Sequence, residues 1–195
     1  MELRCAWVTK DPEYIEYHDK QWGRPVYDPR ELFAKLCLDG QQAGLSWITI
    51  LKRTESYYRA YADFDPQRIV QFDEQDVERL MQDSGIIRNR LKVQSIIKNA
   101  RAYLALEAEG TDFVDYLWGF VGGAPIVHQR QGNGDIPATS PESDAMSKAL
   151  KKRGFTFVGS TICYAFMQAV GMVNDHLVSC PCHAECQQAA RQPRT

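Results

Sequence analysis

Two cysteines and two histidines near the ends of the chain could bind a soft metal. Cys5 and His18 lie near the start of the sequence, and His176 and Cys180 lie near its end. Zinc binds two Cys and two His tetrahedrally, and four protein ligands leave no open position for catalysis. The residue types therefore favour a structural site that ties the two ends of one domain together.

The two half-sites differ in what their spacing predicts. His176 and Cys180 are four residues apart, which places both side chains on one face if a helix runs through them. Twelve residues separate Cys5 from His18, a spacing that selects no structure by itself. Buried thiols and two unrelated histidines would give the same composition. Other residues of the same segment could supply a ligand instead, namely Cys182, His183 and Cys186.

The composition fits one globular domain. The chain has 195 residues, 44% of them hydrophobic, which can bury a sizeable core, in one body or in two helical lobes. We expect residues 181–195 to form a flexible tail. No membrane-spanning run or secretion signal is visible, so we expect a cytoplasmic protein with reduced cysteines. The net charge of −2 means that any binding to DNA would depend on local basic patches.

Capping residues followed by proline mark the starts of several helices. An N-cap followed by a first-turn proline is predicted where Asp or Ser precedes Pro, at Asp11, Asp28, Asp65 and Ser140. Apolar residues at helical spacing predict further helices after Pro29 and over residues 45–61, 73–83, 89–109, 113–121, 140–154 and 158–172. Glycines and prolines predict a loop over residues 122–139. No alternating strand pattern is visible, so the predicted fold class is all-α.

A glycine-containing turn at residues 83–92 separates two of these helices and carries three cations. Its backbone N–H groups and the N-terminus of the next helix could bind a phosphate, with charge from Arg88, Arg90 and Lys92. An ordinary helix-to-helix turn with solvated cations is the alternative. As an isolated signal, the turn favours this alternative.

Several motifs in the same order resemble the 3-methyladenine DNA glycosylase I (Tag) family. They are residues 11–23 (DPEYIEYHDKQWG), 40–47 (GQQAGLSW), 85–88 (GIIR) and 148–155 (KALKKRGF), with shorter matches at 157–159 and 174–176. The resemblance runs nearly end to end. It implies an all-α helix-hairpin-helix glycosylase with one zinc ion held by the residues that correspond to Cys5, His18, His176 and Cys180.

The resemblance implies hydrolysis of the bond between 3-methyladenine and deoxyribose in double-stranded DNA, which leaves an abasic site. The damaged base must leave the stack and enter an aromatic pocket. Family pocket positions correspond to Tyr14, Tyr17, Trp22 and Trp47, of which Tyr17 and Trp47 are favoured for catalysis together with Asp39. The family usually has Glu at position 39, where its carboxylate binds the adenine edge. By residue type alone, each of these aromatic residues is more often part of a core than of a pocket.

The same resemblance implies contacts with DNA on either side of the flipped nucleotide. Gln42, Gly44 and Leu45 would line or enter the gap in the duplex, although a glycine-interrupted junction in the core fits them as well. Gly85 and Arg88 would hold phosphate. A monomer is expected. Two rival functions are a weak or inactive zinc-stapled DNA-binding module and a zinc hydrolase, and the hydrolase would need a free position on the metal.

Overall fold

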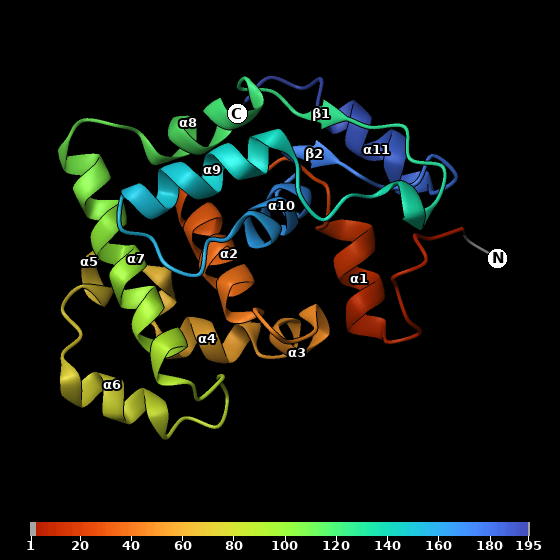
Figure 1. Ribbon diagram of the computed structural model, residues 1–195. Helices are drawn as coiled ribbons and strands as arrows, with labels where there is room; N and C mark the ends of the chain where they lie inside the picture. Colours follow the sequence, from red (N-terminus) through yellow and green to blue (C-terminus); the bar gives the residue numbers. More distant parts are fainter. Residues whose placement is uncertain (1–2, 195) are drawn as a thin grey trace.

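The protein is predominantly helical, as the sequence predicts. The computed structural model describes residues 3–194, and Figure 1 shows α2 and α10 in the middle of the molecule with α7 and α1 on opposite sides. The α-helices of the described residues are α1 (Pro12–Lys20), α2 (Pro29–Gln41), α3 (Trp47–Leu51), α4 (Thr54–Ala60), α5 (Pro66–Ile69), α6 (Glu74–Met81), α7 (Arg90–Ala108), α8 (Phe113–Trp118), α9 (Pro141–Lys152), α10 (Ser160–Ala169) and α11 (Pro181–Ala189). The 3-10 helices are η1 (Ala62–Phe64), η2 (Gly119–Val121) and η3 (Asn133–Asp135).

The predicted caps form at the helix starts. Asp11, Asp28 and Asp65 each accept a hydrogen bond from a backbone N–H in the first turn, and each is followed by proline. Ser140 forms a capping box with Ser143 at the start of α9. These side chains satisfy backbone groups that have no partner inside the helix, which fixes where each helix begins.

Helix α2 is the centre of the hydrophobic core. Its Leu32, Phe33 and Leu36 are fully buried, and the helix packs against α10 and α7. The ring of Phe33 lies 5.3 Å from that of Tyr103 on α7 and 6.4 Å from that of Phe113 on α8. Neighbours on several sides therefore hold α2 in place, and with it the polar residues near its C-terminal end.

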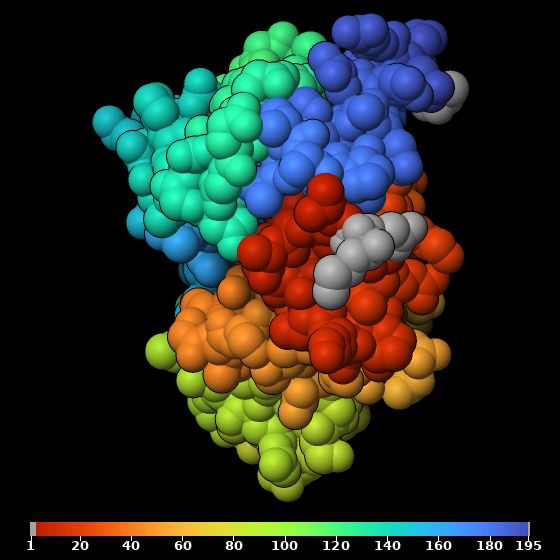
Figure 2. All heavy atoms as spheres, turned by 90° about the vertical axis from the view of Figure 1, so that its right-hand side faces the viewer, coloured from red at the N-terminus to blue at the C-terminus, as the bar shows by residue number. Residues whose placement is uncertain are grey.

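The two ends of the chain lie side by side. Figure 2 shows the N-terminal segment, in red, against the C-terminal segment, in blue. Nearby, β1 (Ile126–Val127) and β2 (Val173–Asn174) form a short parallel pair, with Ile126 opposite Val173. The sequence did not predict this pair, because two-residue strands are too short to show an alternating pattern.

The C-terminal segment differs from what the sequence suggested. The condition of a helix through His176 and Cys180 is not met, because residues 175–180 form a bridge and turns, and Cys180 is the N-cap residue of α11, with Pro181 in its first turn. The flexible tail expected from residue 181 onward is instead helical over Pro181–Ala189, which buries Cys182, His183 and Cys186.

The helix predicted over residues 45–61 is divided into α3 and α4.

Within residues 3–194, every helix falls short of the length or the apolar character that a membrane crossing requires.

Candidate functional site

Cys5, His18, His176 and Cys180 come together in one buried cluster. Each offers a ligand atom, and these atoms lie within 4.8 Å of one another. Cys5 Sγ is 3.5 Å from His176 Nδ1, while Cys180 Sγ is 3.7 Å from His18 Nε2 and 3.8 Å from His176 Nδ1. Tetrahedral bonds of about 2.3 Å to sulfur and about 2.0–2.1 Å to nitrogen would separate the ligand atoms by about 3.6 Å. The cluster therefore has the dimensions to hold a metal ion.

The second nitrogen of each histidine has a partner that orients the ring. His18 Nδ1 lies 2.7 Å from Asp19 Oδ1, and Arg4 donates to the same carboxylate. His176 Nε2 lies 2.8 Å from the carbonyl oxygen of Trp22. When these two nitrogens donate, His18 Nε2 and His176 Nδ1 keep their lone pairs for a metal. Outer partners of this kind are typical of metal-binding histidines.

The alternative ligands of the C-terminal segment have other neighbours. His183 Nε2 lies 2.7 Å from the carbonyl oxygen of His128, and Cys186 Sγ lies 4.0 Å from that of Trp22. Cys182 belongs to a three-membered group with His18 and Asp19, which shares His18 with the main cluster. Hydrogen bonds from Cys182 and Cys5 lower the pKa of Cys180, and the same contact raises the pKa of Cys5. The four residues of the main cluster are therefore the better ligand set.

Five aromatic side chains line a cavity of about 280 Å³ next to this cluster. Tyr14 and Tyr17 belong to α1, Trp47 begins α3, and Trp7 and Trp22 flank α1 in the sequence. The cavity is completed by Asp39, Gln42, Ile136, Ala165 and Gln168. All five residues that the sequence analysis assigned to a base pocket, including Asp39, thus line one cavity.

The aromatic rings pack on one another as a continuous wall. The ring centroids of Tyr17 and Trp47 are 5.6 Å apart, and the ring of Trp7 lies 5.1 Å from Tyr14 and 5.0 Å from Trp22. Trp7 was not among the predicted pocket residues. It lies in an irregular segment without helical periodicity, so its position two residues after Cys5 was the available signal.

Three buried polar atoms of this cavity have no hydrogen-bond partner within residues 3–194. They are Nε1 of Trp7, Nε1 of Trp47 and Oδ2 of Asp39. Buried polar groups are normally paired, and leaving one unpaired costs about 1–3 kcal/mol. The residues that line the cavity therefore include two unpaired N–H donors and one unpaired carboxylate acceptor, together with aromatic faces that suit a flat polar ligand.

Asp39 is held in place by a lysine one helical turn earlier. Lys35 Nζ lies 3.2 Å from Asp39 Oδ1, and the Asp39 side chain is 3% exposed. Burial raises the pKa of the Asp39 carboxyl, and the ammonium of Lys35 acts in the opposite direction. Burial also lowers the pKa of Lys35. The sequence analysis did not single out Lys35, although a spacing of four residues within a helix predicts such a pair.

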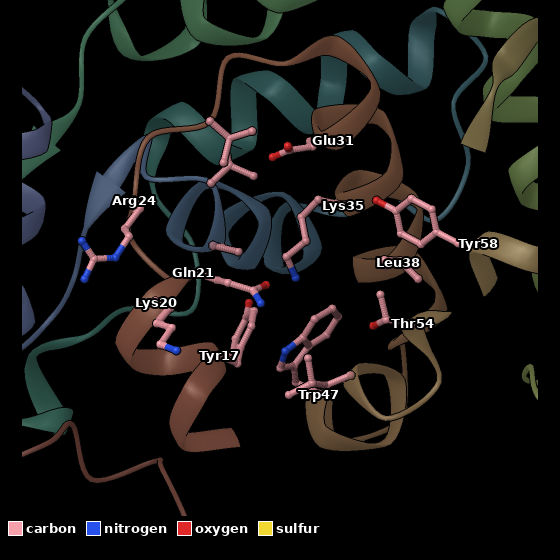
Figure 3. Close-up of a pocket in the computed structure, with 14 residues that line it drawn as sticks. Tyr17, Lys20, Gln21, Arg24, Glu31, Lys35, Leu38, Trp47, Thr54 and Tyr58 are labelled. Carbon is pink, nitrogen blue, oxygen red and sulfur yellow. The ribbon is translucent and has the colours of Figure 1, made fainter. Parts of the chain in front are cut away.

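A second cavity, of about 510 Å³, lies on the other side of the aromatic wall. Tyr17 and Trp47 line both cavities, so these two side chains separate them. Figure 3 shows Lys35 entering the second cavity from α2 and pointing toward Trp47 and Tyr17. Lys35 therefore lies on the side of the larger cavity, whereas Asp39 and Trp7 line the smaller one.

Gln42, Gly44 and Leu45 lie in the turn between α2 and α3. Gly44 has a φ of +77°, a conformation that favours glycine, and a Cβ there would meet no atom within 4 Å. Leu45 is 39% exposed, and Gln42 lines the aromatic cavity. Leu45 is thus a surface residue at the mouth of the turn rather than a core residue.

The turn between α6 and α7 places Gly85 against α4 and leaves Arg88 exposed. A Cβ on Gly85 would lie 2.8 Å from the side chain of Ser56, so only glycine fits without a shift. The exposed Arg88 side chain has no hydrogen-bond or ion-pair partner in the described part of the chain. Its charge is therefore available to an anion from outside.

The other two cations of this turn have partners within the protein, as the alternative of an ordinary turn would have it at these two positions. Arg90 pairs with Glu74 at 3.1 Å and with Glu78 at 2.6 Å. Lys92 is 7% exposed and donates to the carbonyl oxygens of residues 41 and 43, at 2.8 and 2.6 Å. Lys92 thereby fixes the turn after α2 against α7.

A family model for methyladenine glycosylase matches residues 7–183, which include the aromatic cavity and most of the cysteine–histidine cluster. The protein therefore belongs to the methyladenine glycosylase family. It is 57% identical over 180 residues to DNA-3-methyladenine glycosylase 1 of Escherichia coli, covering 92% of this chain and 96% of that protein. It is 53% identical to DNA-3-methyladenine glycosylase of Haemophilus influenzae, covering 93% of this chain and 98% of that one.

Solved structures of similar proteins have the same fold. A crystal structure of 3-methyladenine DNA glycosylase I (TAG) superimposes with a TM-score of 0.92 at 57% identity, covering 93% of this chain and 100% of that one. The enzyme from Staphylococcus aureus, whose structure concerns 3-methyladenine recognition, gives a TM-score of 0.88 at 38% identity, covering 98% of each chain. A tyrosine-to-phenylalanine variant of a 3-methyladenine DNA glycosylase I in complex with 3-methyladenine also has a TM-score of 0.88, at 38% identity, covering 98% of this chain and 99% of that one.

Proposed function

We propose that the protein is a DNA-3-methyladenine glycosylase of base-excision repair, active as a single domain over residues 1–195. It hydrolyses the N-glycosidic bond of 3-methyladenine in alkylated double-stranded DNA and leaves an abasic site. The observation that carries the proposal is the aromatic cavity in which Asp39 Oδ2 is buried without a partner among the described residues. The family membership and the names of the similar proteins support the same reaction.

The cavity binds the damaged base after it leaves the duplex. Unpairing and unstacking cost a few kcal/mol. Stacking on aromatic rings offsets this cost by about 1–3 kcal/mol per base. Tyr14, Tyr17, Trp22 and Trp47 supply the aromatic faces, and Asp39 Oδ2 accepts a hydrogen bond from the adenine edge. The base thereby pairs an oxygen that is otherwise unsatisfied.

Asp39, Tyr17 and Trp47 are the catalytic residues because they contact the leaving base. Methylation at N3 gives the base a positive charge in the nucleotide, and cleavage returns the bonding electrons to the base, which leaves neutral. Water adds to the sugar carbon and gives its proton to solvent, so little acid catalysis is needed. Electron-rich rings and a carboxylate attract the cationic base, and this attraction strengthens when water is excluded. The interactions that recognise the base are therefore nearly the same as those that promote its cleavage.

Asp39 is shorter than the family's usual Glu by one carbon–carbon bond, about 1.5 Å. A backbone adjustment or a bridging water extends its reach to the base. The rival interpretation is weakened or altered base specificity. The lack of a partner for Oδ2 within residues 3–194 favours an acceptor that still serves a ligand.

The DNA contacts come from the two turns. Gln42, Gly44 and Leu45 occupy the gap that the flipped nucleotide leaves, and the exposed Leu45 is suited to this position. Gly85 and Arg88 hold phosphate in a helix-hairpin-helix and supply affinity that is independent of sequence. The charge of Arg88, which has no partner in the part of the chain that the structure describes, supports this role.

The metal of the cysteine–histidine cluster is a single zinc ion with a structural role. Two thiolates and two imidazoles are ligands that zinc prefers, and four of them fill its tetrahedral sphere. Zinc would cross-link the segments that carry its ligands, and it would take no part in the reaction at the sugar. The cluster joins Cys5 and His18 at one end of the chain to His176 and Cys180 at the other.

The alternative is a catalytically weak or inactive zinc-stapled module that binds DNA. It would keep the metal cluster and the turn at Arg88, but it would have no use for an aromatic cavity with unpaired polar atoms. We further propose that the enzyme is monomeric and cytoplasmic, and that it associates with the bacterial nucleoid during repair.

The test is incubation of the folded, metal-loaded protein with alkylated duplex DNA, followed by chromatography of the released bases. Selective release of 3-methyladenine is expected. Release of no base would leave the DNA-binding module as the better description.

A further inference from the structure

Lys35 is a charged residue of the site that the reaction described so far does not use. Its Nζ lies 3.3 Å from the centroid of the Trp47 ring and 5.3 Å from that of Tyr17, and 3.2 Å from Asp39 Oδ1. It lines the cavity of about 510 Å³, whereas Asp39 lines the smaller aromatic cavity. Lys35 therefore contacts three base-pocket residues, namely Tyr17, Trp47 and Asp39, from the side of the larger cavity (Figure 3).

We propose that Lys35 is a positioning residue that fixes the Asp39 carboxylate and the Trp47 ring for base recognition, so that Asp39 Oδ2 faces the base. This inference rests on the proposed function. It assigns to Lys35 a role in the orientation and charge of the pocket, without direct contact to the substrate.

The two oxygens of the Asp39 carboxylate have different surroundings. Oδ1 accepts from Lys35, while Oδ2 is buried and has no partner within residues 3–194. A carboxylate that can rotate would present either oxygen to the pocket. The Lys35 ammonium contacts the Trp47 ring and binds Oδ1. The favoured orientation of the carboxylate is therefore the one in which Oδ1 faces Lys35 and Oδ2 is left for the base.

Lys35 also opposes the effect of burial on the pKa of this carboxylate. Burial raises the pKa of Asp39, and the Coulombic attraction of Lys35 followed by its hydrogen bond lowers it. The other titratable groups that face Asp39 are Tyr17 on α1 and Cys163 on α10. Burial raises the pKa of Tyr17 well above its usual value and that of Cys163 to about 12, so both are neutral near pH 7. Lys35 is thus the cation that faces Asp39 in the described residues.

Further charged groups surround Lys35 itself. Lys20, Arg24 and Glu31 line the same larger cavity, and two of them are paired elsewhere. Lys20 bonds to Glu16 at 3.2 Å, and Arg24 bonds to Glu185 at 2.6 Å. The cation that lowers the pKa of Asp39 is Lys35, so its removal leaves a buried carboxylate that ionises only at higher pH.

The experiment compares Lys35→Met, Lys35→Gln and Lys35→Arg with the wild type. Single-turnover release of 3-methyladenine is measured from about pH 5 to 9, and the Asp39 carboxyl is followed by ¹³C NMR after its signal is identified with Asp39→Asn. An opposite charge at this distance lowers a carboxyl pKa by about 1–3 units. We therefore expect the acid limb of the pH profile and the carboxyl titration to move up by about that amount in Lys35→Met and Lys35→Gln. Lys35→Arg should keep both near their wild-type positions.

Lys20→Met is the matched control, because Lys20 lines the same cavity but pairs with Glu16 at the surface. It should leave both pH curves unchanged. Purely structural damage would lower activity at every pH without moving the acid limb of the pH profile or the titration of the Asp39 carboxyl. That result in Lys35→Met and Lys35→Gln would overturn the inference. It is also overturned, without any variant, if the wild-type Asp39 carboxyl is still protonated at pH 7. If the carboxyl titration moves but the wild type releases no 3-methyladenine, the proposed function fails and the role of Lys35 remains.

Discussion

At the scale of single residues, Asp39 combines three properties that rarely occur together. It is almost fully buried, it is paired through one oxygen only among the described residues, and it stands in a wall of aromatic rings. A buried acceptor without a partner is unfavourable in the free protein. The same acceptor becomes favourable once a ligand donates to it, which makes Asp39 a recognition residue in our account.

We expect Asp39→Asn to weaken the binding of free 3-methyladenine by about 10- to 100-fold. A hydrogen bond to a charged group contributes about 1.5–3 kcal/mol, and an amide lacks that charge. Asp39→Glu should bind within a few-fold of the wild type, because it keeps the carboxylate. Base titration and single-turnover cleavage measure both effects. Equal performance of Asn and Asp would mean that carboxylate recognition is wrong.

Individual residues were predictable from the sequence to different degrees. Tyr14, Tyr17, Trp22 and Trp47, which the family motifs assigned to one pocket, line one cavity, and their contact with a base stays a prediction. Trp7 and Gln168 were missed, since neither belongs to a quoted motif and only tertiary packing brings them to the cavity. Lys35 had a local signal, its spacing from Asp39, but the contact with the Trp47 ring depends on how α3 packs against α2.

At the scale of elements, two turns face outward with different kinds of side chain. The turn between α2 and α3 exposes Leu45, and the turn between α6 and α7 exposes Arg88. Lys92 of α7 joins the first turn to the helix that follows the second. The two turns are therefore mechanically linked, and we expect them to engage one DNA duplex together.

Arg88→Ala should weaken binding to undamaged and damaged duplexes alike and reduce the slope of log affinity against log salt concentration by about 1. The affinity for free 3-methyladenine should not change, because Arg88 lies outside the cavity. Titration of labelled duplex at several salt concentrations measures the slope.

Arg90→Ala is the matched control for this prediction. Arg90 is two residues away, but it is already paired with Glu74 and Glu78, so its loss should affect DNA binding much less. Equal losses for the two variants would contradict the assignment of phosphate contact to Arg88.

Short sequence motifs predicted the first residues of the helices better than they predicted the last residues or the breaks within helices. The Asp and Ser caps form as expected, because capping depends on a few adjacent residues. A helix through His176 and Cys180 would have placed both side chains on one face, but turns after β2 bring the same two side chains together. Helix α11 was missed because its Cys, His and Gln residues give no clear apolar face, and its burial depends on the N-terminal segment beside it.

At the scale of the whole molecule, the cysteine–histidine cluster holds the two ends of the chain together. His18 is adjacent to Tyr17, and the ring of His176 lies 4.6 Å from that of Trp22. The cluster therefore supports one side of the aromatic cavity. We expect its metal to act first on stability and only secondarily on cleavage.

Cys5→Ser and His176→Ala should lose metal and stability together. A ligand present at about 1,000 times its Kd stabilises the folded state by about 4 kcal/mol, which corresponds to a fall of about 8–16 °C in Tm for a chain of this size. Metal analysis and thermal melts measure these losses, with an expected content of one zinc per wild-type chain. Cys163→Ala, a buried cysteine outside the cluster, should keep the metal. A stable, metal-free variant that has lost catalysis would overturn the structural assignment.

The most direct test of the central claim is a crystal structure of the metal-loaded protein with free 3-methyladenine. Our account predicts the base in the aromatic cavity of about 280 Å³, stacked on Trp47, with its edge donating to Asp39 Oδ2 directly or through one water. A base bound in the larger cavity beside Lys35, or bound away from Asp39, would contradict it.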